Sequence, residues 1–262
     1  MRYDGIYRVS AEGDEIFLTD DMGKATLLYV PEGILTLEEQ PYSGYGVASP
    51  VSVTISEENT PALPKVVTVE NEPLAVEIYK EDAFTGAPMA ASFTLLDGTG
   101  KTIPLARMSD GAYRPADTVS EAAKAEERAE ADGTQAAPTL VEKVNALTLD
   151  AKTGKARIEY LTEGTYQLVE DPVSGYMALS GIEFTLQNQH TKTLPLQCTV
   201  SNLPTRFLLE KQDGATKQPL QSAKFKLTYS LWFSRKMVHT GRPWKAKPAL
   251  RFWSLPMRMP RP

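Results

Sequence analysis

Three polar residues, Lys80, Glu170 and Asn202, lie where strand alternation places them among apolar side chains. Residues i, i+2 and i+4 of a β-strand share one face of a sheet, so an apolar, alternating pattern marks the face toward the core. The apolar residues that share a face with them are Leu74, Val76 and Ile78 for Lys80, Tyr166 and Leu168 for Glu170, and Leu196, Cys198 and Val200 for Asn202. Burying an unpaired charge costs several kcal/mol, so three inward polar residues suggest a common cause.

The chemistry that these residue types suggest is an amide bond between Lys80 and Asn202. An amine attacks only when it is neutral, and burial among apolar side chains lowers the pKa of a lysine. The asparagine carbonyl reacts poorly unless an acid donates a hydrogen bond to its oxygen and protonates the departing ammonia. A buried, protonated Glu170 can do both, and a dry pocket supplies the proximity. The bond would join the first and last strands of a domain, as a disulfide does elsewhere.

A purely structural explanation is open for each residue. Lys80 can extend its amine to solvent from a strand end. Glu170 can be an exposed residue that opens a turn, and Asn202 can cap the strand end before Pro204. These explanations are not independent, because an internal repeat retains all three residue types.

The repeat relates GILTLEEQPYSGY at 33–45 to GTYQLVEDPVSGY at 164–176, at an offset of 131 positions. A fixed offset indicates repeated structural units. The same offset pairs Glu39 with Glu170, Asn71 with Asn202, and Lys80 with Lys211. Each of the outer copies is therefore incomplete: the first has Glu39 and Asn71 without a lysine, and the last has Lys211 alone. One hypothesis is that the Lys211 strand of one chain completes the first unit of another.

The repeat divides the chain into predicted parts. These are a truncated domain at 1–72, a complete domain at 73–203, the first strands of a third domain at 204–229, and a basic tail rich in Trp, Pro and Arg at 230–262. Within the complete domain, residues 118–142 form an insert that is rich in Ala and Glu but lacks a wide apolar stripe. That composition predicts a short solvated helix or a disordered loop.

The tail has no acidic residue after Tyr229 and no clear periodicity. We interpret it as a frameshifted or miscalled end. The alternatives are a segment that binds a membrane surface or a polyanion, and a native disordered terminus. We expect the ends of the chain to be incomplete, which would explain why it shows neither a signal peptide nor a wall-sorting signal.

Composition excludes several classes of function. The net charge of the chain is −5, with an acidic body and a basic tail. The acidic body argues against nucleic acid as a partner. Cys198 is the only cysteine, so no intrachain disulfide forms, and we expect it to be a small core residue. With two histidines in unrelated contexts, we expect no metal site and no cofactor. No apolar run of about 18 residues predicts a membrane span.

The ordered motifs resemble the Cna B-type, or SpaA-type, prealbumin-like domain of Gram-positive pilins and surface adhesins. They are K-x-D before a T-G turn, Gly-Lys-Ala before a strand, Gly-Thr-Tyr-x-Leu-x-Glu followed by Gly-Tyr, and a closing Thr-Val-x-Asn-x-Pro. The resemblance covers about 1–229. It implies an all-β fold of tandem prealbumin-like (Ig-like, transthyretin-type) sandwiches of about seven strands. It also implies that Lys80 is the amine donor, Glu170 the proton shuttle and Asn202 the acceptor, with Glu39, Asn71 and Lys211 as incomplete equivalents.

The function that follows is a secreted stalk, pilin or adhesin subunit at the cell wall, stabilised by a Lys–Asn isopeptide bond. Its expected partners are other surface or pilin subunits, with host matrix or glycan as further candidates. The alternative is a ligand-binding adhesion module that uses the 118–142 insert and has no isopeptide bond. A hydrolase is not expected, because Glu39 and Glu170 belong to separate units and neither has a second inward carboxylate beside it.

Overall fold

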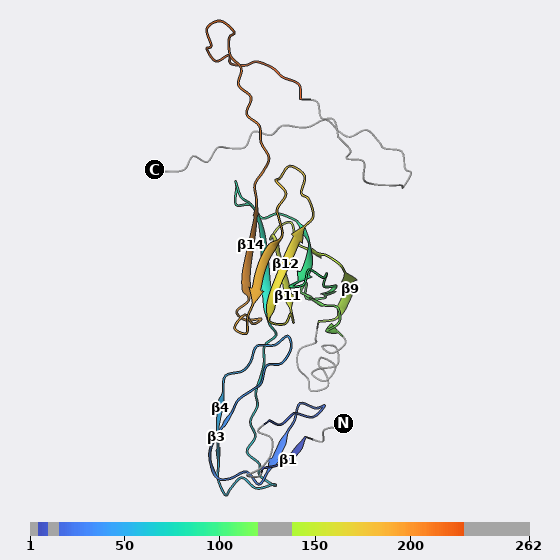
Figure 1. The fold of residues 1–262 in the computed structure, drawn as a ribbon, viewed down its shortest axis with the longest axis vertical. Coiled ribbons are helices and arrows are strands. Elements are labelled where there is room, and N and C mark those ends of the chain that lie inside the picture. Colours follow the sequence, from blue (N-terminus) through green and yellow to red (C-terminus); the bar gives the residue numbers. More distant parts are fainter. Residues whose placement is uncertain (1–4, 10–15, 120–137, 228–262) are drawn as a thin grey trace, which may run out of the picture. The chain divides into compact units, whose positions relative to one another are not determined.

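The computed structural model describes residues 5–9, 16–119 and 138–227. By its contacts the chain divides into two compact units, residues 1–207 and 208–262. All fourteen elements that the structure describes are β-strands, which confirms the all-β prediction (Figure 1). Across the described ranges, no helix has the length and apolar character needed to cross a membrane. The division into domains at 1–72, 73–203 and 204–229 stays a prediction, and we refer to residues 1–72 as module 1 and 73–203 as module 2.

Module 2 consists of two sheets. The larger has the strand order β14-β5-β11-β8-β7-β9 and the smaller the order β10-β6-β12-β13. The strands of the larger sheet are β5 (Ala75–Asp82), β7 (Leu105–Met108), β8 (Tyr113–Pro115), β9 (Leu140–Val144), β11 (Lys155–Glu159) and β14 (Leu196–Asn202). Those of the smaller sheet are β6 (Ser92–Asp97), β10 (Leu147–Thr148), β12 (Gly164–Glu170) and β13 (Ile182–Leu186). The described residues of module 2 form ten strands where about seven were expected, because the ten include short strands such as β8, β9 and β10.

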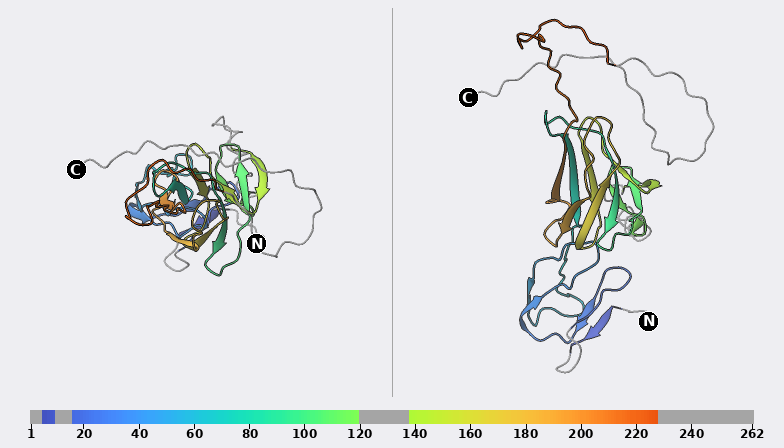
Figure 2. Two further views of the ribbon diagram at one scale, coloured as in Figure 1. Left: turned by 90° about the horizontal axis from the view of Figure 1, so that it is seen from above. Right: turned by 45° about the horizontal axis from the view of Figure 1, so that its top comes forward.

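One hydrophobic core lies between these sheets, so module 2 is a β-sandwich (Figure 2). The larger sheet contributes buried residues such as Ile78 and Ile158, and the smaller contributes Phe93 and Leu168. The buried residues alternate with more exposed ones along β5, β12 and β14, as the sequence predicted. Cys198 is a free, buried thiol in this core, which agrees with its predicted role.

Strand β5 has a strand on each side. It pairs antiparallel with β11 and parallel with β14, and Lys80 faces Val200 while Asp82 faces Asn202 in the parallel register. Because β5 and β14 are parallel, the chain enters β5 at one end of the sandwich and leaves β14 at the other. Strand β14 has a neighbour on one side only, so β5 is what holds this edge of the sheet.

Module 1 repeats part of this topology. Strands β1 (Ile6–Arg8) and β2 (Thr26–Leu28) pair in parallel, like β8 and β11, and β3 (Gly33–Leu37) and β4 (Val51–Ile55) pair antiparallel, like β12 and β13. The repeat pairs Asn71 with Asn202, the last residue of β14, but residues 65–71 form no strand. Strand β14 pairs with β5, and no described residue of module 1 supplies a counterpart of β5. Without a neighbouring strand, the backbone N–H and C=O groups of residues 65–71 have no partners for the hydrogen bonds of a sheet.

The predicted insert at 118–142 is shorter in the structure. Leu140, Val141 and Glu142 belong to β9, which pairs antiparallel with β7. The sequence could not show this pairing, because β7 lies before the insert and β9 after it. Residues 120–137, and the basic tail at 230–262, lie outside the described residues, so the predicted helix or loop and the predicted disorder stay predictions.

Candidate functional site

Lys80 lies on the inward face of β5 and has no solvent-exposed surface. Its neighbours at the same parity, Val76 and Ile78, are also fully buried. Removal of the ammonium from water lowers the pKa of Lys80, and the negative charge of Glu170 only partly opposes this. The structure therefore excludes the explanation that Lys80 extends its amine to solvent. A larger share of this lysine is neutral at a given pH than of an exposed one.

Glu170 ends β12 on the opposite sheet and points at the same place. Its side chain is 3% exposed, and its Oε1 atom lies 3.3 Å from Nζ of Lys80. Its second oxygen, Oε2, accepts a hydrogen bond of 2.8 Å from Nδ2 of Asn202. One carboxylate thus bridges the amine and the amide, and Glu170 is not an exposed residue of the turn.

Asn202 ends β14 and is 1% exposed. Its side chain points inward toward Glu170, in addition to any role in capping the strand before Pro204. Three buried atoms of the site have no hydrogen-bond partner in the structure: Nζ of Lys80, Oε1 of Glu170 and Oδ1 of Asn202. Nζ of Lys80 and Oε1 of Glu170 have only their mutual ion pair, and Oδ1 of Asn202 accepts no hydrogen bond. Buried polar groups normally make hydrogen bonds, so this cluster calls for a chemical explanation.

Two further residues of this region, Asp82 and Tyr176, were not predicted from the sequence as part of the site. The hydroxyl of Tyr176 donates a hydrogen bond of 2.7 Å to Oδ2 of Asp82. This bond is the main cause of the lowered pKa of Asp82, and it raises the pKa of Tyr176. The other oxygen of Asp82 accepts hydrogen bonds from the backbone of Phe84 and Thr85. The available signals were the parity that Asp82 shares with Lys80 and the repeated Gly-Tyr motif.

A second buried carboxylate, Glu159 of β11, also escaped the sequence argument. It is fully buried and lies within ion-pair distance of Arg157 (3.2 Å), Lys192 (3.4 Å) and Arg114 (3.9 Å). Its parity is opposite to that of the core residue Ile158, so alternation alone places it outside the sandwich. Three cations balance its charge, which makes Glu159 part of an ion-pair network and not a second member of a hydrolytic pair.

Among the described residues, neither of the other copies brings a lysine, a glutamate and an asparagine together. In module 1, Nδ2 of Asn71 donates to Oε2 of Glu39 over 2.6 Å, which repeats the pairing of Asn202 with Glu170. The same oxygen of Glu39 also accepts from the backbone of Ala48. Lys211 is exposed, and its Nζ donates to the carbonyl of Gln212.

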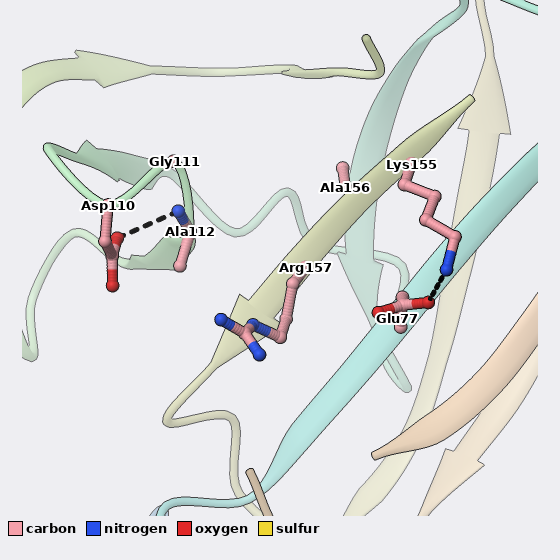
Figure 3. A pocket seen from close by; sticks show the side chains of 7 residues that line it. All are labelled: Glu77, Asp110, Gly111, Ala112, Lys155, Ala156 and Arg157. Carbon is pink, nitrogen blue, oxygen red and sulfur yellow. Dashed lines mark hydrogen bonds and ion pairs between the residues drawn. The ribbon is translucent and has the colours of Figure 1, made fainter. Parts of the chain in front are cut away.

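A shallow pocket on the surface of module 2 offers no convincing ligand site (Figure 3). It lies beside β11, where Lys155 is paired with Glu77. Across the pocket, a carboxylate oxygen of Asp110 accepts from the backbone of Ala112. Arg157, which also lines it, is paired with Glu159. Because these charged groups already have partners, the pocket gives the ligand-binding alternative no support.

Comparison with solved structures finds three pilins to which the chain is similar. The chain is similar to the shaft pilin SpaA of Lactobacillus rhamnosus GG, with 20% identity, a TM-score of 0.34, and 72% of this chain and 70% of that chain covered. It is also similar to the pilus 2b backbone protein of group B streptococcus (22%, TM-score 0.36, 61% and 52% covered). A minor pilin of Streptococcus agalactiae matches with 19% identity and a TM-score of 0.34, over 74% of this chain and 69% of that one.

No family model matches the chain, and no curated protein does so at a significant level. Each of these three similar structures is a pilin.

Proposed function

We propose that module 2 forms an isopeptide bond between Lys80 and Asn202, with Glu170 as the proton shuttle. The observation that carries the proposal is the position of the Glu170 carboxylate, 3.3 Å from Nζ of Lys80 and 2.8 Å from Nδ2 of Asn202. A group that touches both the nucleophile and the leaving group can take a proton from one and give a proton to the other.

The reaction balances without any added reagent. Nζ of Lys80 attacks Cγ of Asn202, and a C–N bond forms. Glu170 removes a proton from the attacking nitrogen at Oε1 and delivers a proton to Nδ2 through Oε2. The bond between Cγ and Nδ2 then breaks, and ammonia leaves. The lowered pKa of Lys80 favours the neutral amine that the first step requires.

The site excludes water, which suits a reaction that must end in an amide and not in hydrolysis. The side chains of Lys80 and Glu170 are 0% and 3% exposed, and Asn202 as a whole residue is 1% exposed. Each comes from a different strand of the sandwich, so folding itself brings the reactants together. The reaction occurs once per molecule, and the protein is not an enzyme in the sense of turnover.

We infer that the biological role is mechanical: a subunit of a pilus shaft or surface stalk on the outside of a Gram-positive cell. A covalent tie between the first and last strands of a domain serves a protein that is pulled along its length. Because the chain has a single cysteine, an intrachain disulfide cannot provide this tie, and the proposed amide would provide it instead. The expected partners are other pilin or surface subunits.

The test is the intact mass of the purified protein. The parent should be lighter than its sequence mass by one ammonia, and Glu170→Ala should have its full sequence mass. Glu183→Ala, which removes an exposed carboxylate on β13, is the matched control and should behave like the parent.

Succinimide formation at an asparagine also releases ammonia, so the loss must be located. Peptide mapping should find a branched peptide that joins the β5 segment to the β14 segment through Lys80 and Asn202. A parent with its full sequence mass, or a loss that maps to one linear peptide, would refute the proposal.

A further inference from the structure

The loop that follows Glu170 is fastened to the chain that follows Asn202. Glu170 ends β12 and Asn202 ends β14. Beyond these strand ends, Tyr176 and Pro204 form an antiparallel bridge, and backbone hydrogen bonds of 2.8 Å and 2.9 Å flank it. The two segments therefore meet at the end of the sandwich where the site lies.

Tyr176 also connects this loop to β5. Its hydroxyl donates a hydrogen bond of 2.7 Å to Oδ2 of Asp82, which is two residues after Lys80 and on the same inward face. Asp82 lies directly opposite Asn202 in the parallel ladder of β5 and β14. We call Asp82 and Tyr176 the clasp, because their hydrogen bond joins β5 to the loop that follows Glu170.

The turn that follows β5 does not need the clasp. Residues 82–86 read D-A-F-T-G, and residues 150–154 read D-A-K-T-G. In both turns, Oδ1 of the aspartate accepts hydrogen bonds of 2.7 to 2.9 Å from the backbone N–H groups two and three residues later. In both, the glycine N–H also donates to the aspartate carbonyl. No tyrosine among the described residues bonds to Asp150, so the turn forms without the hydrogen bond that Tyr176 gives to Asp82.

Burial distinguishes the two aspartates. Asp150 is exposed, whereas Asp82 is only 9% exposed. A buried carboxylate oxygen normally has a hydrogen-bond partner, and the hydroxyl of Tyr176 is the partner of Oδ2. The same hydrogen bond is the main cause of the lowered pKa of Asp82, so this carboxylate stays charged at neutral pH. Without the hydroxyl, Oδ2 would need a water molecule, and that water would lie beside Asn202.

We propose that the clasp positions the groups that form the proposed amide. Its hydrogen bond closes this end of the sandwich against water, and it holds the loop after Glu170 on β5, so that the carboxylate of Glu170 stays between the amine and the amide. Neither side chain of the clasp takes part in the proton transfer. This role rests on the proposed function, to which it adds two residues that set the rate of the reaction.

Opening the clasp should slow the reaction for two reasons. Water at the site would stabilise the charged form of Lys80, which is not a nucleophile. The loop after Glu170 would also lose an attachment to β5, and a displacement of about 1 Å between reacting groups can cost roughly a hundredfold in rate. We therefore expect the amide to form at least about tenfold more slowly without the clasp.

The experiment is a time course of ammonia loss from the newly made chain. The full chain is synthesised in a cell-free system, synthesis is stopped, and the intact mass is measured at intervals. Tyr176→Phe removes the hydroxyl and keeps the ring, and Asp82→Ala removes the carboxylate. Both should lose ammonia at least about tenfold more slowly than the parent. Tyr176→Phe, which leaves the turn after β5 intact, decides the test if Asp82→Ala does not fold.

Two matched controls remove similar groups outside the clasp. Tyr166→Phe removes another tyrosine hydroxyl of module 2, which donates to the carbonyl of Thr162 before the start of β12. Asp150→Ala removes the aspartate of the second D-A-x-T-G turn. Both should react at the rate of the parent. Asp82→Asn should stay close to that rate as well, because its amide oxygen can accept from the turn while its NH₂ group donates to the tyrosine oxygen.

A clasp that only stabilises the fold would give a different result. It would contribute to the free energy of unfolding, but its loss would leave the rate unchanged while nearly all molecules are folded. Urea titration of each change in the Asn202→Ala background, which cannot form the amide, gives the folded fraction. If Tyr176→Phe is folded and loses ammonia as fast as the parent, the positioning role is overturned and the proposed function stands. A parent that never loses ammonia refutes the proposed function, and the clasp with it.

Discussion

Loss of the bond in Asn202→Ala should cost module 2 much of its stability. The substitution removes the acceptor and leaves the ion pair of Lys80 with Glu170 in place, so no buried charge loses its partner. If the proposed bond has formed, Nδ2 of Asn202 has left the parent as ammonia, so its hydrogen bond with Glu170 does not enter the comparison. The two proteins therefore differ by the cross-link and by the free, buried amine that Lys80 keeps in the variant.

The magnitude follows from the length of chain that the bond closes. Lys80 and Asn202 are 122 positions apart. A cross-link around a loop of this size lowers the entropy of the unfolded chain enough to stabilise the folded state by about 5 kcal/mol. For a domain of this size, that difference lowers the melting temperature by roughly 15–20 °C.

The assay is thermal unfolding of the parent and of Asn202→Ala, each after its mass has been measured. Asn145→Ala, which changes an exposed asparagine of the same module, controls for the loss of an amide elsewhere and should melt like the parent. If the parent has lost its ammonia and Asn202→Ala still melts within about 3 °C of it, the loop-entropy reasoning is wrong.

Three further predictions concern pH and reactivity. In Asn202→Ala the buried amine of Lys80 keeps its lowered pKa, so the folded state binds fewer protons than the unfolded chain. Its stability should rise with pH between that lowered value and the ordinary 10.5, as urea titrations at several pH values can measure. Tyr176→Phe removes the main cause of the lowered pKa of Asp82; the resulting loss of stability should be present above pH 3.8 and disappear as the pH falls through the folded pKa, as acid unfolding can show. Burial raises the pKa of Cys198. A thiol reagent should therefore label Cys198 at least tenfold more slowly in the native protein than in the unfolded one. Equal labelling rates in the two states would contradict this prediction.

Much of the site could be predicted because strand alternation is a local property. Lys80, Glu170 and Asn202 each follow a run of inward apolar residues, so their direction could be deduced without knowing which strands pair. The repeat then indicated that the three belong together. The structure adds what parity cannot supply: the 3.3 Å and 2.8 Å separations and the depth of burial.

Other features depend on pairings that no local pattern encodes. The contact of Tyr176 with Asp82 joins residues 94 positions apart. Glu159 is buried although its parity is opposite to that of Ile158, because cations from other segments surround it. Residues 65–71, the repeat counterparts of β14, form no strand for the converse reason: no described residue of module 1 supplies the neighbour that β14 has in β5. A strand is a property of a pair, and sequence propensity describes only one member.

The position of the proposed bond would decide how module 2 responds to an applied force. Tension applied at Pro73 and Pro204 enters at the start of β5 and leaves at the end of β14, because these strands run parallel in adjacent positions. With an amide from Lys80 to Asn202, the covalent path runs along β5, crosses the bond and exits two residues later. Residues 81–201 lie outside that path, so they can neither be extended nor be unfolded by pulling on the ends. Without the bond, the same tension would act on the hydrogen bonds that hold β14 at the edge of its sheet. The proposed amide would therefore matter most at β14, an edge strand that has a neighbour on one side only.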